Sequence, residues 1–529
     1  MSDVRVRFAP SPTGHVHIGN IRAAIFNWLF ARNQGGKFLL RVEDTDKERS
    51  SQAAIDSLLE CMNWLGLDFD EEAFYQSTQA EHHIATAERL IAEGHAYRAP
   101  KGEGAEVTLF RMPWLKEEAP FLKKIGSAEQ ALHPEKSITI DYTGMSFFLV
   151  SKKGKAVPQE NICLAGFRDL QIFDADGNVI FEIEKEIDSI LSKEKSFTFD
   201  NAAKMTFTRH SVTFNDMIKG ELSKPLDSMK DLVIVKSDGS PLFHLANVLD
   251  DITQKMSHIV RGDDHVENTY RHIPLYHVLG EVAPIYAHLP MIVNQSGKPY
   301  SKRDGDAYVG DFRTNGYTAE TLFNYLILLG WSPGDTEKVS REDAIKLFDL
   351  TRCKSTAAQM DMDKLFNLNG QYIEEMDQEV FNSQAKEQLS SQDWFSAEDT
   401  YFAKVAELMK SRTKLITQVD TWKYFFVAIP EQTDEKKAKK AFGAEGIADT
   451  LKAIATAFEG LTDFNAANAE QAIKDTAEKL GLKAGKLNLP IRLSATGVGG
   501  GAELFPTLEL LGQDAVVKRI RFAADNHCQ

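Results

Sequence analysis

Apolar and polar positions at the start of the chain show two different periodicities. Residues 4–8, VRVRF, alternate as in a short strand, whereas residues 20–32, NIRAAIFNWLFAR, have helical spacing. Residues 35–46, GGKFLLRVEDTD, then predict a turn and a strand with an acidic end, and residues 53–67 return to helical spacing. Strand, helix, strand and helix in this order predict a doubly wound parallel sheet.

A second part of the same sheet is expected further along the chain. Residues 231–239, DLVIVKSDG, and 257–265, SHIVRGDDH, are strand-like, and residues 272–280 have helical spacing. We therefore divide the sheet into two parts, residues 1–97 and residues 206–310.

An inserted module, residues 98–205, separates these two parts and has a different sequence pattern. Within residues 98–205, apolar residues alternate on both sides of Asp176-Gly177, which is a strong hairpin signal. We expect an α+β module that is held together by apolar packing. The side chains expected in its core are Phe147, Phe148, Ile172, Ile180 and Phe181.

The chain becomes helical after Val309 and stays so to its end. An amphipathic helix is predicted over residues 319–331. The remainder has helical periodicity with breaks at Pro430, Pro490 and the glycine run 498–501. The predicted fold class is therefore α/β plus α, with helical regions over residues 311–370 and 371–529.

Composition narrows the class of protein but not its function. Hydrophobic residues make up 43% and charged residues 26% of the 529 residues, as in soluble globular proteins. No apolar run reaches the roughly 18 residues that span a bilayer, and the N-terminus lacks the apolar core of a signal peptide, so we expect no membrane association and a cytoplasmic location. The net charge of −16 argues against a surface that binds polyanions everywhere, but it leaves room for a local basic groove.

The segment RFAPSPTGHVHIGN, residues 7–20, places two histidines and a helix start directly after a predicted strand. Ligands of doubly wound sheets bind where strands end and helices begin, and the free N–H groups of a helix start suit phosphate. Gly19 lets a nucleotide approach the backbone, and His17 and Asn20 can donate hydrogen bonds to phosphate oxygens. A purely structural turn explains this segment equally well by itself.

A second cationic segment follows the strand-like residues 289–294. Residues 297–306, GKPYSKRDGD, offer Lys298, Lys302 and Arg303 among small and polar residues, so we expect a mobile loop with cationic tips. A basic loop alone is usually only solvated. Beside a histidine-bearing helix start on the same sheet, it forms the second half of an expected ATP site.

These segments carry a family resemblance. HIGN (17–20) resembles the HIGH signature of class I aminoacyl-tRNA synthetases, and PYSKR (299–303) resembles their KMSKS signature. With LLRVEDTDKERS, HIVRGDDHVENT and NYLILLGWSPGD, most of residues 1–97 and 206–370 resembles bacterial glutamyl-tRNA synthetases, and the resemblance weakens after residue 370. It implies a Rossmann-type catalytic domain split by an acceptor-end module, then a stem-contact region and an anticodon-binding region.

The resemblance implies a two-step reaction. Glutamate and ATP, with Mg²⁺ on the phosphates, form glutamyl-adenylate, and the glutamyl group then moves to the 3′ end of tRNA(Glu). The family pattern gives the catalytic role to His17, Asn20 and Lys302. It gives ATP contacts to His17, Gly19, Asn20, Arg49, Ser301, Lys302 and Arg303. Arg412 and Arg492 match positions used near anticodon bases, with a solvated helix face as the alternative.

Glutamate binding needs cations for the side-chain carboxylate and an anion for the α-ammonium group. Arg7, Glu43 and Arg261 end predicted strands, so they are expected to face one crevice. In the family pattern the two arginines hold the carboxylate and Glu43 holds the ammonium, while the other contacts come from Ala9, Ser11, Phe243 and Asn247. Paired arginines reject neutral glutamine by up to roughly 10⁴-fold.

Three positions depart from the family pattern. Asn20 replaces the last histidine of the first signature, and Pro299 replaces the first lysine of the second, which leaves more of the phosphate contact to Lys302. Phe243 stands where a tyrosine hydroxyl usually helps to hold the glutamate side chain.

We expect no zinc site. The family often carries a zinc knuckle that begins near an AYxC sequence, but Ala99 occupies the cysteine position here. His133 and Cys163 alone cannot supply the four ligands of a tetrahedral zinc. His82 and His83 lie on a helix that we expect to be exposed, and we assign them no role.

Three rival functions stay open. A glutaminyl-type or non-discriminating enzyme shares much of the fold, although the APSPTG turn and the pair of Arg7 and Arg261 favour glutamate. A short paralogue that glutamylates a modified tRNA base lacks the helical C-terminal half. A non-catalytic RNA-binding descendant is expected to lose His17, Glu43 or Lys302, and all three are present. The expected partners are tRNA(Glu), ATP and L-glutamate, and we expect a monomer.

Overall fold

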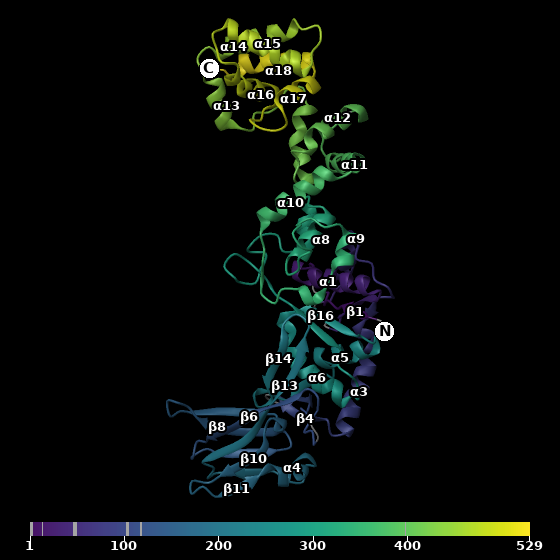
Figure 1. The fold of residues 1–529 in the computed structure, drawn as a ribbon, viewed down its shortest axis with the longest axis vertical. Helices are drawn as coiled ribbons and strands as arrows, with labels where there is room; N and C mark the ends of the chain where they lie inside the picture. The colour runs from purple at the N-terminus through teal and green to yellow at the C-terminus, as the bar shows by residue number, and fades with distance from the viewer. Residues whose placement is uncertain are drawn as a thin grey trace. The chain divides into compact units, whose positions relative to one another are not determined.

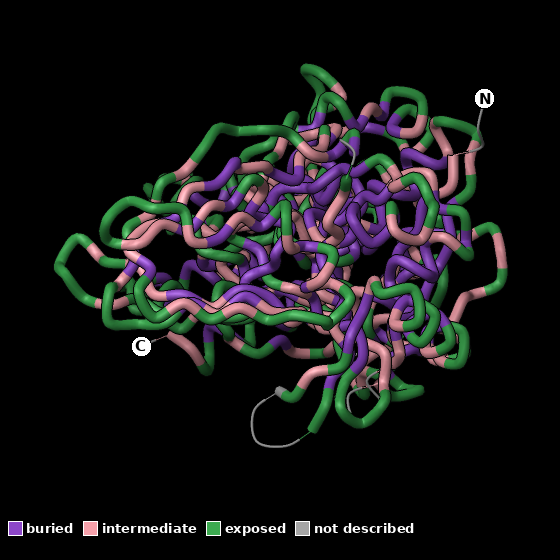
Figure 2. The backbone as a smooth tube through the Cα atoms, turned by 90° about the horizontal axis from the view of Figure 1, so that it is seen from below, coloured by how far each residue is buried: buried purple, intermediate pink, exposed green. Residues whose placement is uncertain are grey.

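The computed structural model describes residues 4–12, 14–45, 50–101, 105–116, 119–396 and 398–528 (Figure 1). The chain forms two compact units. The first contains Met1–Val309 and Leu326–Met360, and the second contains Gly310–Tyr325 and Asp361–Gln529. Buried and exposed stretches alternate along the backbone (Figure 2). No described helix is long and apolar enough to cross a bilayer.

The chain begins with strand–helix–strand units, as its apolar pattern predicts. β1 (Arg5–Phe8), β2 (Lys37–Val42) and β3 (Phe74–Tyr75) form a parallel sheet in that order. α1 (Ile18–Gln34) connects β1 to β2, and α2 (Gln52–Trp64) lies between β2 and β3 in the chain. α1 ends where Gly35 takes a left-handed conformation with φ of 63°, which glycine adopts without strain. α3 (Ala80–Ala92) follows β3.

The second part of the sheet lies beside the first. β16 (His258–Gly262) and β17 (Ile285–Leu289) are parallel and are joined through α6 (Val266–Val278). The Ser257 amide donates to the Arg5 carbonyl at 3.0 Å, and the Asn27 side chain in α1 donates to the Val260 carbonyl at 2.9 Å. The predicted doubly wound sheet in two parts is therefore confirmed.

One strand of the apolar pattern belongs to a different sheet. β15 (Leu232–Val235) forms within residues 231–239, but it pairs antiparallel with β5 (Ala105–Phe110), which pairs with β4 (Ala96–Lys101). The expectation that this segment joins the parallel sheet is wrong, because apolar alternation identifies a strand and not its partner. α5 (Phe243–Thr253) follows β15 and contributes residues to the site described below.

A long strand joins the inserted module to the parallel sheet. β13 (Lys204–Asp216) pairs antiparallel with β6 (Leu122–Ala131), β10 (Arg168–Phe173) and β14 (Gly220–Pro225). Its last residue, Asp216, pairs with Tyr286 in β17. A second sheet of the module has the order β12 (Phe197–Phe199), β7 (Ile138–Asp141), β8 (Gly144–Val150) and β9 (Ala156–Ile162), and α4 (Ile183–Leu191) precedes β12 in the chain.

The interior of the module largely follows the sequence pattern. β10 and β11 (Val179–Glu182) form the predicted hairpin, with Gly177 at a φ of 85° in the turn. Phe147, Ile172 and Phe181 are buried in the core, and Ile180 packs at its edge. Phe148 lies outside this core and is half-buried, so its assignment is wrong. Successive side chains of a strand point to opposite faces, so Phe147 and Phe148 cannot both enter one core.

Short elements complete the region after the cationic loop. β18 (Ile292–Val293) pairs in parallel with β19 (Ala358–Gln359). α7 (Val309–Thr314) is followed by α8 (Ala319–Leu328), which confirms the helix predicted over residues 319–331. α9 (Arg341–Leu347) comes next in the chain.

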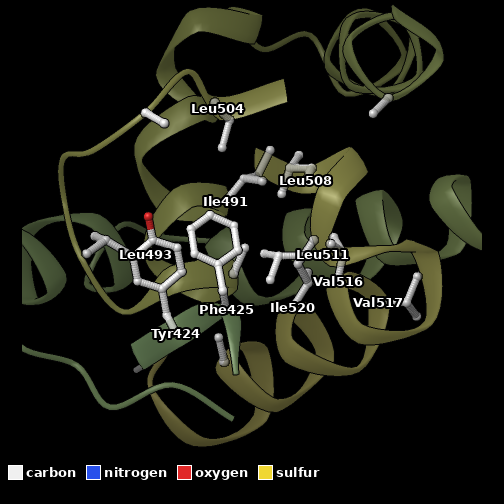
Figure 3. Close-up of a cluster of buried hydrophobic side chains, with 14 of the residues drawn as sticks. Tyr424, Phe425, Ile491, Leu493, Leu504, Leu508, Leu511, Val516, Val517 and Ile520 are labelled. Atoms are coloured by element: carbon white, nitrogen blue, oxygen red, sulfur yellow. The ribbon is translucent and has the colours of Figure 1, made fainter. Parts of the chain in front are cut away.

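The second unit is helical, as predicted, and has one large apolar core (Figure 3). Its helices are α10 (Met362–Glu375), α11 (Gln378–Leu389), α12 (Asp399–Lys410), the 3₁₀ helix Ile416–Phe425, α13 (Glu435–Phe442), α14 (Ile447–Glu459), α15 (Ala466–Lys479), α16 (Asn488–Thr496), α17 (Leu504–Leu511) and α18 (Gln513–Asn526). Phe425, Ile491, Leu508 and Ile520 meet in this core (Figure 3). Each such buried side chain stabilises the unit by about 1.5–3 kcal/mol.

Two of the three predicted helix breaks are present in this unit. The chain is not helical at Pro430 or over the glycine run 498–501. The break predicted at Pro490 is wrong, because Pro490 lies in the first turn of α16. A proline is tolerated there, since the first N–H groups of a helix have no partner within the helix.

Candidate active site

A cavity of about 590 Å³ opens at the carboxyl ends of β1, β2 and β16, beside the start of α1. This is the edge at which ligands of doubly wound sheets bind. All of the lining residues belong to the first unit. They include many of the residues singled out in the sequence: Arg7, Ala9, Ser11, His17, Gly19, Asn20, Glu43, Phe243, Asn247 and Arg261.

His17 marks the N-terminus of α1. Its Nδ1 accepts a hydrogen bond from the Gly19 amide at 3.1 Å, so a neutral His17 carries its proton on Nε2. Burial lowers the pKa of His17, although a hydrogen bond to the Tyr300 backbone acts in the opposite direction. A Cβ atom on Gly19 would lie 3.3 Å from His17 Nδ1, so glycine keeps this acceptor uncrowded. The helix start and its positive dipole end therefore face the cavity, with Asn20 exposed.

The cationic loop is tied to the same helix start. Tyr308 pairs with His17 in an antiparallel bridge, and the two ring centroids are 6.1 Å apart. Lys302 Nζ lies 5.4 Å from the centroid of the Tyr308 ring. Asp304 accepts hydrogen bonds from the Ser301 amide and hydroxyl at 3.0 Å and 2.9 Å, which holds the loop in a turn.

The structure places the predicted ATP-contact residues in two groups. His17, Gly19 and Asn20 line the cavity, together with Pro299 and Tyr300 from the loop. Ser301, Lys302 and Arg303 are not among the residues that line it. Arg49, also predicted to contact ATP, lies outside the described residues.

Buried charges form a chain between β1, β2 and α5. Asp251 Oδ1 accepts hydrogen bonds from Arg7 Nε at 2.9 Å and from Arg41 Nη1 at 2.6 Å. Arg41 Nη2 also donates to Glu43 Oε1 at 3.3 Å, and Asn247 Nδ2 donates to the same oxygen at 2.9 Å. Burial alone would raise the pKa of Asp251, but the charges of Arg41 and Arg7 outweigh it and the pKa is lowered. For Glu43, burial outweighs these charges and the pKa is raised.

Arg261 differs from Arg7 and Arg41, because it contacts no carboxylate among the described residues. Its Nε donates to His288 Nε2 at 3.2 Å, and its Nη2 donates to Thr269 Oγ1 at 2.7 Å and to the His265 carbonyl at 3.3 Å. Burial lowers the pKa of Arg261. A buried cation without a counterion favours the binding of an anionic group in the cavity.

Phe243 presents an apolar ring to the cavity. Its ring centroid is 5.9 Å from those of His265 and His272, and His272 Nε2 lies 3.1 Å from His244 Nδ1. Burial lowers the pKa of His244 to about 4 and that of His272 well below its usual value, so both are neutral at pH 7. The Phe243 ring therefore packs against His244 and His272 in their neutral forms.

Several residues around the cavity were not singled out in the sequence. Arg41, Asp251 and His288 are fully buried and take part in these polar contacts, but the sequence pattern assigned them no role, although Arg41 lies within the segment LLRVEDTDKERS. The one available signal was the acidic pair at 250–251, which interrupts the apolar face of a helix pattern.

The expectation that His82 and His83 lie on an exposed helix is wrong for His83. This residue is fully buried in α3, and its Nε2 lies 2.7 Å from Asp250 Oδ1. His83 shares a helix face with Ala87 and Leu90, which are also buried, so its position on the apolar stripe was the missed signal.

Potential metal ligands do not gather anywhere in the described part of the chain. Within it, no group of three or more His, Cys, Asp and Glu side chains is placed to hold a metal ion. Cys163 Sγ contacts the Leu226 carbonyl at 3.2 Å, and burial raises the pKa of its thiol. The absence of zinc stays a prediction.

The second unit has a cavity of about 580 Å³ beside the glycine run that follows α16. Tyr424 and Gly501 line it, and a Cβ atom on Gly501 would lie 3.9 Å from Arg492 Nη1. Burial lowers the pKa of Arg492, Tyr424 opposes this shift, and the charge of Arg412 adds to it. The two arginines singled out in the sequence therefore lie near each other, and Arg492 lies close to Gly501, which lines this cavity.

Comparison with known proteins gives the family of both units. The family model described as "tRNA synthetases class I (E and Q), catalytic domain" matches residues 3–112 and 181–367. The model described as "Anticodon binding domain" matches residues 380–524.

Relatives match over the full length of the chain. The chain is 33% identical to "Glutamate--tRNA ligase 1" of Erythrobacter litoralis, covering 98% of this chain and 95% of the relative. It is also 33% identical to "Glutamate--tRNA ligase 1" of Caldanaerobacter subterraneus, covering 99% and 98%. A solved glutamate tRNA ligase from Elizabethkingia meningosepticum, in complex with its amino acid, has a TM-score of 0.72 at 26% identity and covers 99% of this chain and 100% of that one.

Proposed function

This chain belongs to the class I tRNA synthetases of the E and Q type, and we propose that it is a glutamate–tRNA ligase. It activates L-glutamate with MgATP to form glutamyl-adenylate and pyrophosphate. It then transfers the glutamyl group to the 3′-terminal ribose of tRNA(Glu).

The observation that carries this proposal is the unneutralised charge of Arg261. The guanidinium is buried, lines the cavity and contacts only neutral acceptors among the described residues. Arg7, on the adjacent strand, shares its one carboxylate partner with Arg41. The carboxylate of a glutamate side chain supplies the missing anion, whereas the neutral amide of glutamine leaves the buried charge uncompensated.

Glu43 suits the α-ammonium group of the amino acid. Its carboxylate lies at the end of β2, lines the cavity, and is oriented by Arg41 and Asn247. Burial raises the pKa of Glu43, which means that its charged form is disfavoured in the substrate-free site. A bound ammonium group would stabilise that charged form. Together, the two arginines and Glu43 define a pocket for an amino acid with an acidic side chain, completed by Ala9, Ser11, Phe243 and Asn247.

The start of α1 suits the phosphates of ATP. In the first step the α-carboxylate of glutamate attacks the α-phosphorus, and pyrophosphate leaves. This step needs charge stabilisation on the phosphates more than a protein nucleophile. The His17 imidazole and the Asn20 side chain line the cavity beside this helix start, and Lys302 supplies a mobile positive charge from the adjacent loop, where Ser301 and Arg303 complete the proposed phosphate contacts.

Recognition of tRNA is assigned to two parts of the chain. The inserted module is proposed to contact the acceptor end, without zinc. Arg412 and Arg492, near the cavity of the second unit, are proposed to contact unpaired anticodon bases, because arginine stacks on and hydrogen-bonds to bases in single-stranded loops.

The proposal is tested with purified protein by ATP–pyrophosphate exchange and by charging of purified tRNA isoacceptors. Exchange that depends on glutamate and not on glutamine, with charging of tRNA(Glu), is the expected result. Charging of tRNA(Gln) with glutamate would identify a non-discriminating enzyme. Exchange with glutamine, or with neither amino acid, would contradict the proposal.

A further inference from the structure

The contacts of Arg261 leave one of its nitrogens available to a ligand. A guanidinium has five N–H donors. The Nε donor is used on His288 Nε2, and Nη2 donates to Thr269 Oγ1 and to the His265 carbonyl. Within the described residues, Nη1 makes no hydrogen bond, and Arg261 lines the cavity. Nη1 is therefore the donor that remains for the carboxylate of a substrate.

His288 is held in one tautomer by a carboxylate behind it. Its Nδ1 lies 2.6 Å from Asp216 Oδ2, and Arg261 Nε donates to its Nε2. Because a guanidinium can only donate, Nε2 must be the acceptor, and the proton of the neutral ring lies on Nδ1 and is donated to Asp216. The Thr269 hydroxyl lies 3.1 Å from the same Nε2 and also accepts a hydrogen bond from Arg261 Nη2.

Asp216 is itself fixed by the end of β13. Its carboxylate accepts hydrogen bonds from the backbone amides of Ile218 and Lys219, both at 2.9 Å, and from the amide of His288 at 3.1 Å. These three backbone donors stabilise the negative charge of Asp216. The carboxylate and the guanidinium are thus connected, but one imidazole ring separates them.

We propose that His288, held by Asp216, is a specificity-determining positioning residue that fixes Arg261 through a neutral acceptor. This inference rests on the proposed function. A carboxylate in direct contact with Arg261 would orient it equally well but would also offset its charge, as the shared carboxylate of Asp251 does in part for Arg7 and Arg41. Coulomb attraction falls with distance, so the interposed ring leaves more of the positive charge for the substrate. The arrangement orients Arg261 and keeps glutamate preferred over glutamine.

The test compares His288→Leu with His288→Gln and with a matched control. His288→Leu removes the acceptor, and we expect the KM for glutamate to rise about 10- to 100-fold, since a misplacement of about 1 Å has effects of this size. The KM for ATP should change by less than about 2-fold, and discrimination against glutamine should fall. His288→Gln, whose amide can accept from Arg261 and donate to Asp216, should recover most of the loss.

The control and the double mutant separate positioning from a general structural effect. His83→Leu also removes a buried histidine that is paired with a carboxylate, at 2.7 Å, but it does not line the cavity. It should leave the KM for glutamate within about 3-fold of the wild type. In an Arg261→Met background, His288→Leu should have no further effect on that KM, because residues that act through one contact are not additive. If His288→Leu does not fold, Thr269→Val removes the other neutral side-chain acceptor of Arg261, and the same coupling with Arg261→Met is expected.

Several outcomes would overturn the inference while leaving the proposed function intact. These are an unchanged glutamate KM in His288→Leu, equal effects on glutamate and ATP, additivity with Arg261→Met, or no recovery in His288→Gln. The proposed function fails separately if the wild-type protein does not activate glutamate at all.

Discussion

Replacing Arg261 with methionine is expected to weaken glutamate binding without weakening the fold. Methionine keeps a similar length but has no charge and no donor. It removes the guanidinium whose Nη1 is available to the substrate carboxylate, while Arg7 keeps only its contact with Asp251. Losing one charged hydrogen bond of this kind costs on the order of 2–5 kcal/mol. The KM for glutamate should therefore rise by about 30-fold to several thousand-fold.

The same Arg261→Met substitution should leave the stability of the substrate-free protein unchanged or raise it. Burial lowers the pKa of Arg261, which means that the charged form is disfavoured at this position before substrate binds. An apolar side chain of similar volume removes that penalty, so the melting temperature should equal or exceed that of the wild type. A loss of function with retained or increased stability is the signature of a binding residue held in an unfavourable state.

The assay is ATP–pyrophosphate exchange in the presence of tRNA(Glu), with glutamate varied at saturating ATP and then the reverse. The KM for ATP should stay within about 3-fold, because the proposed phosphate contacts lie at the start of α1 and in the adjacent loop. Arg32→Met is the matched control, since Arg32 forms ion pairs with Asp68 and Asp70 at the surface. An equal loss of ATP and glutamate affinity would place Arg261 in the nucleotide site and refute the reasoning, and a strongly lowered melting temperature would refute the stability argument.

Four further predictions follow from the same structure. Lys302→Ala should slow adenylate formation by roughly 10²–10³-fold in single-turnover assays and leave glutamate affinity nearly unchanged. Lys298→Ala is the control in the same loop. An unchanged rate with weaker glutamate binding would show that Lys302 does not contact the phosphates. Arg492→Ala should raise the KM for tRNA(Glu) by about 10-fold or more without changing exchange, and Arg412→Ala should act in the same direction; unchanged tRNA affinity in both would contradict the anticodon assignment. The folded pKa of His244 is about 4, below its unfolded value of about 6.5, so the folded state binds fewer protons and stability is lost as pH falls from about 6.5 to 4. The free energy of unfolding should fall by at most about 3 kcal/mol over this range. If a His244→Asn variant loses as much stability with falling pH in calorimetry as the wild type, His244 is not the cause of the acid sensitivity. Chelation should leave the melting temperature unchanged once Mg²⁺ is restored, and stoichiometric zinc in elemental analysis would show that a zinc site exists.

Local sequence was sufficient for the elements and for the part of the site that is contiguous in the chain. His17, Gly19 and Asn20 lie within four residues, so the helix start that they form is decided by neighbouring residues and by the strand before it. The strand ends at Arg7 and Glu43 follow from the same apolar alternation, and a parallel sheet brings such ends to one edge. These features depend on short-range geometry, which a sequence pattern records.

The sequence pattern was less informative where two partners are far apart in the chain. Arg7 and Asp251 are separated by 244 residues, and Arg41 and Asp251 by 210. A helical pattern predicts which side of its helix Asp251 occupies, but it does not predict which strand packs against that side. The same limit explains β15, which formed as a strand but paired with β5 instead of the parallel sheet.

Burial and the state of charge were decided only by the tertiary structure. A histidine or an arginine has the same local signal whether it is solvated or buried, so the exposed helix expected for His83 was wrong, and His288 was not singled out. The pKa of Arg261 and the neutral form of His288 depend on desolvation and on partners from β13, β17 and α6. The sequence therefore determined which chemical groups are available, and the packing of distant elements determined which of them are left charged and unpaired for a substrate, because desolvation and Coulomb energies depend on all neighbours in space.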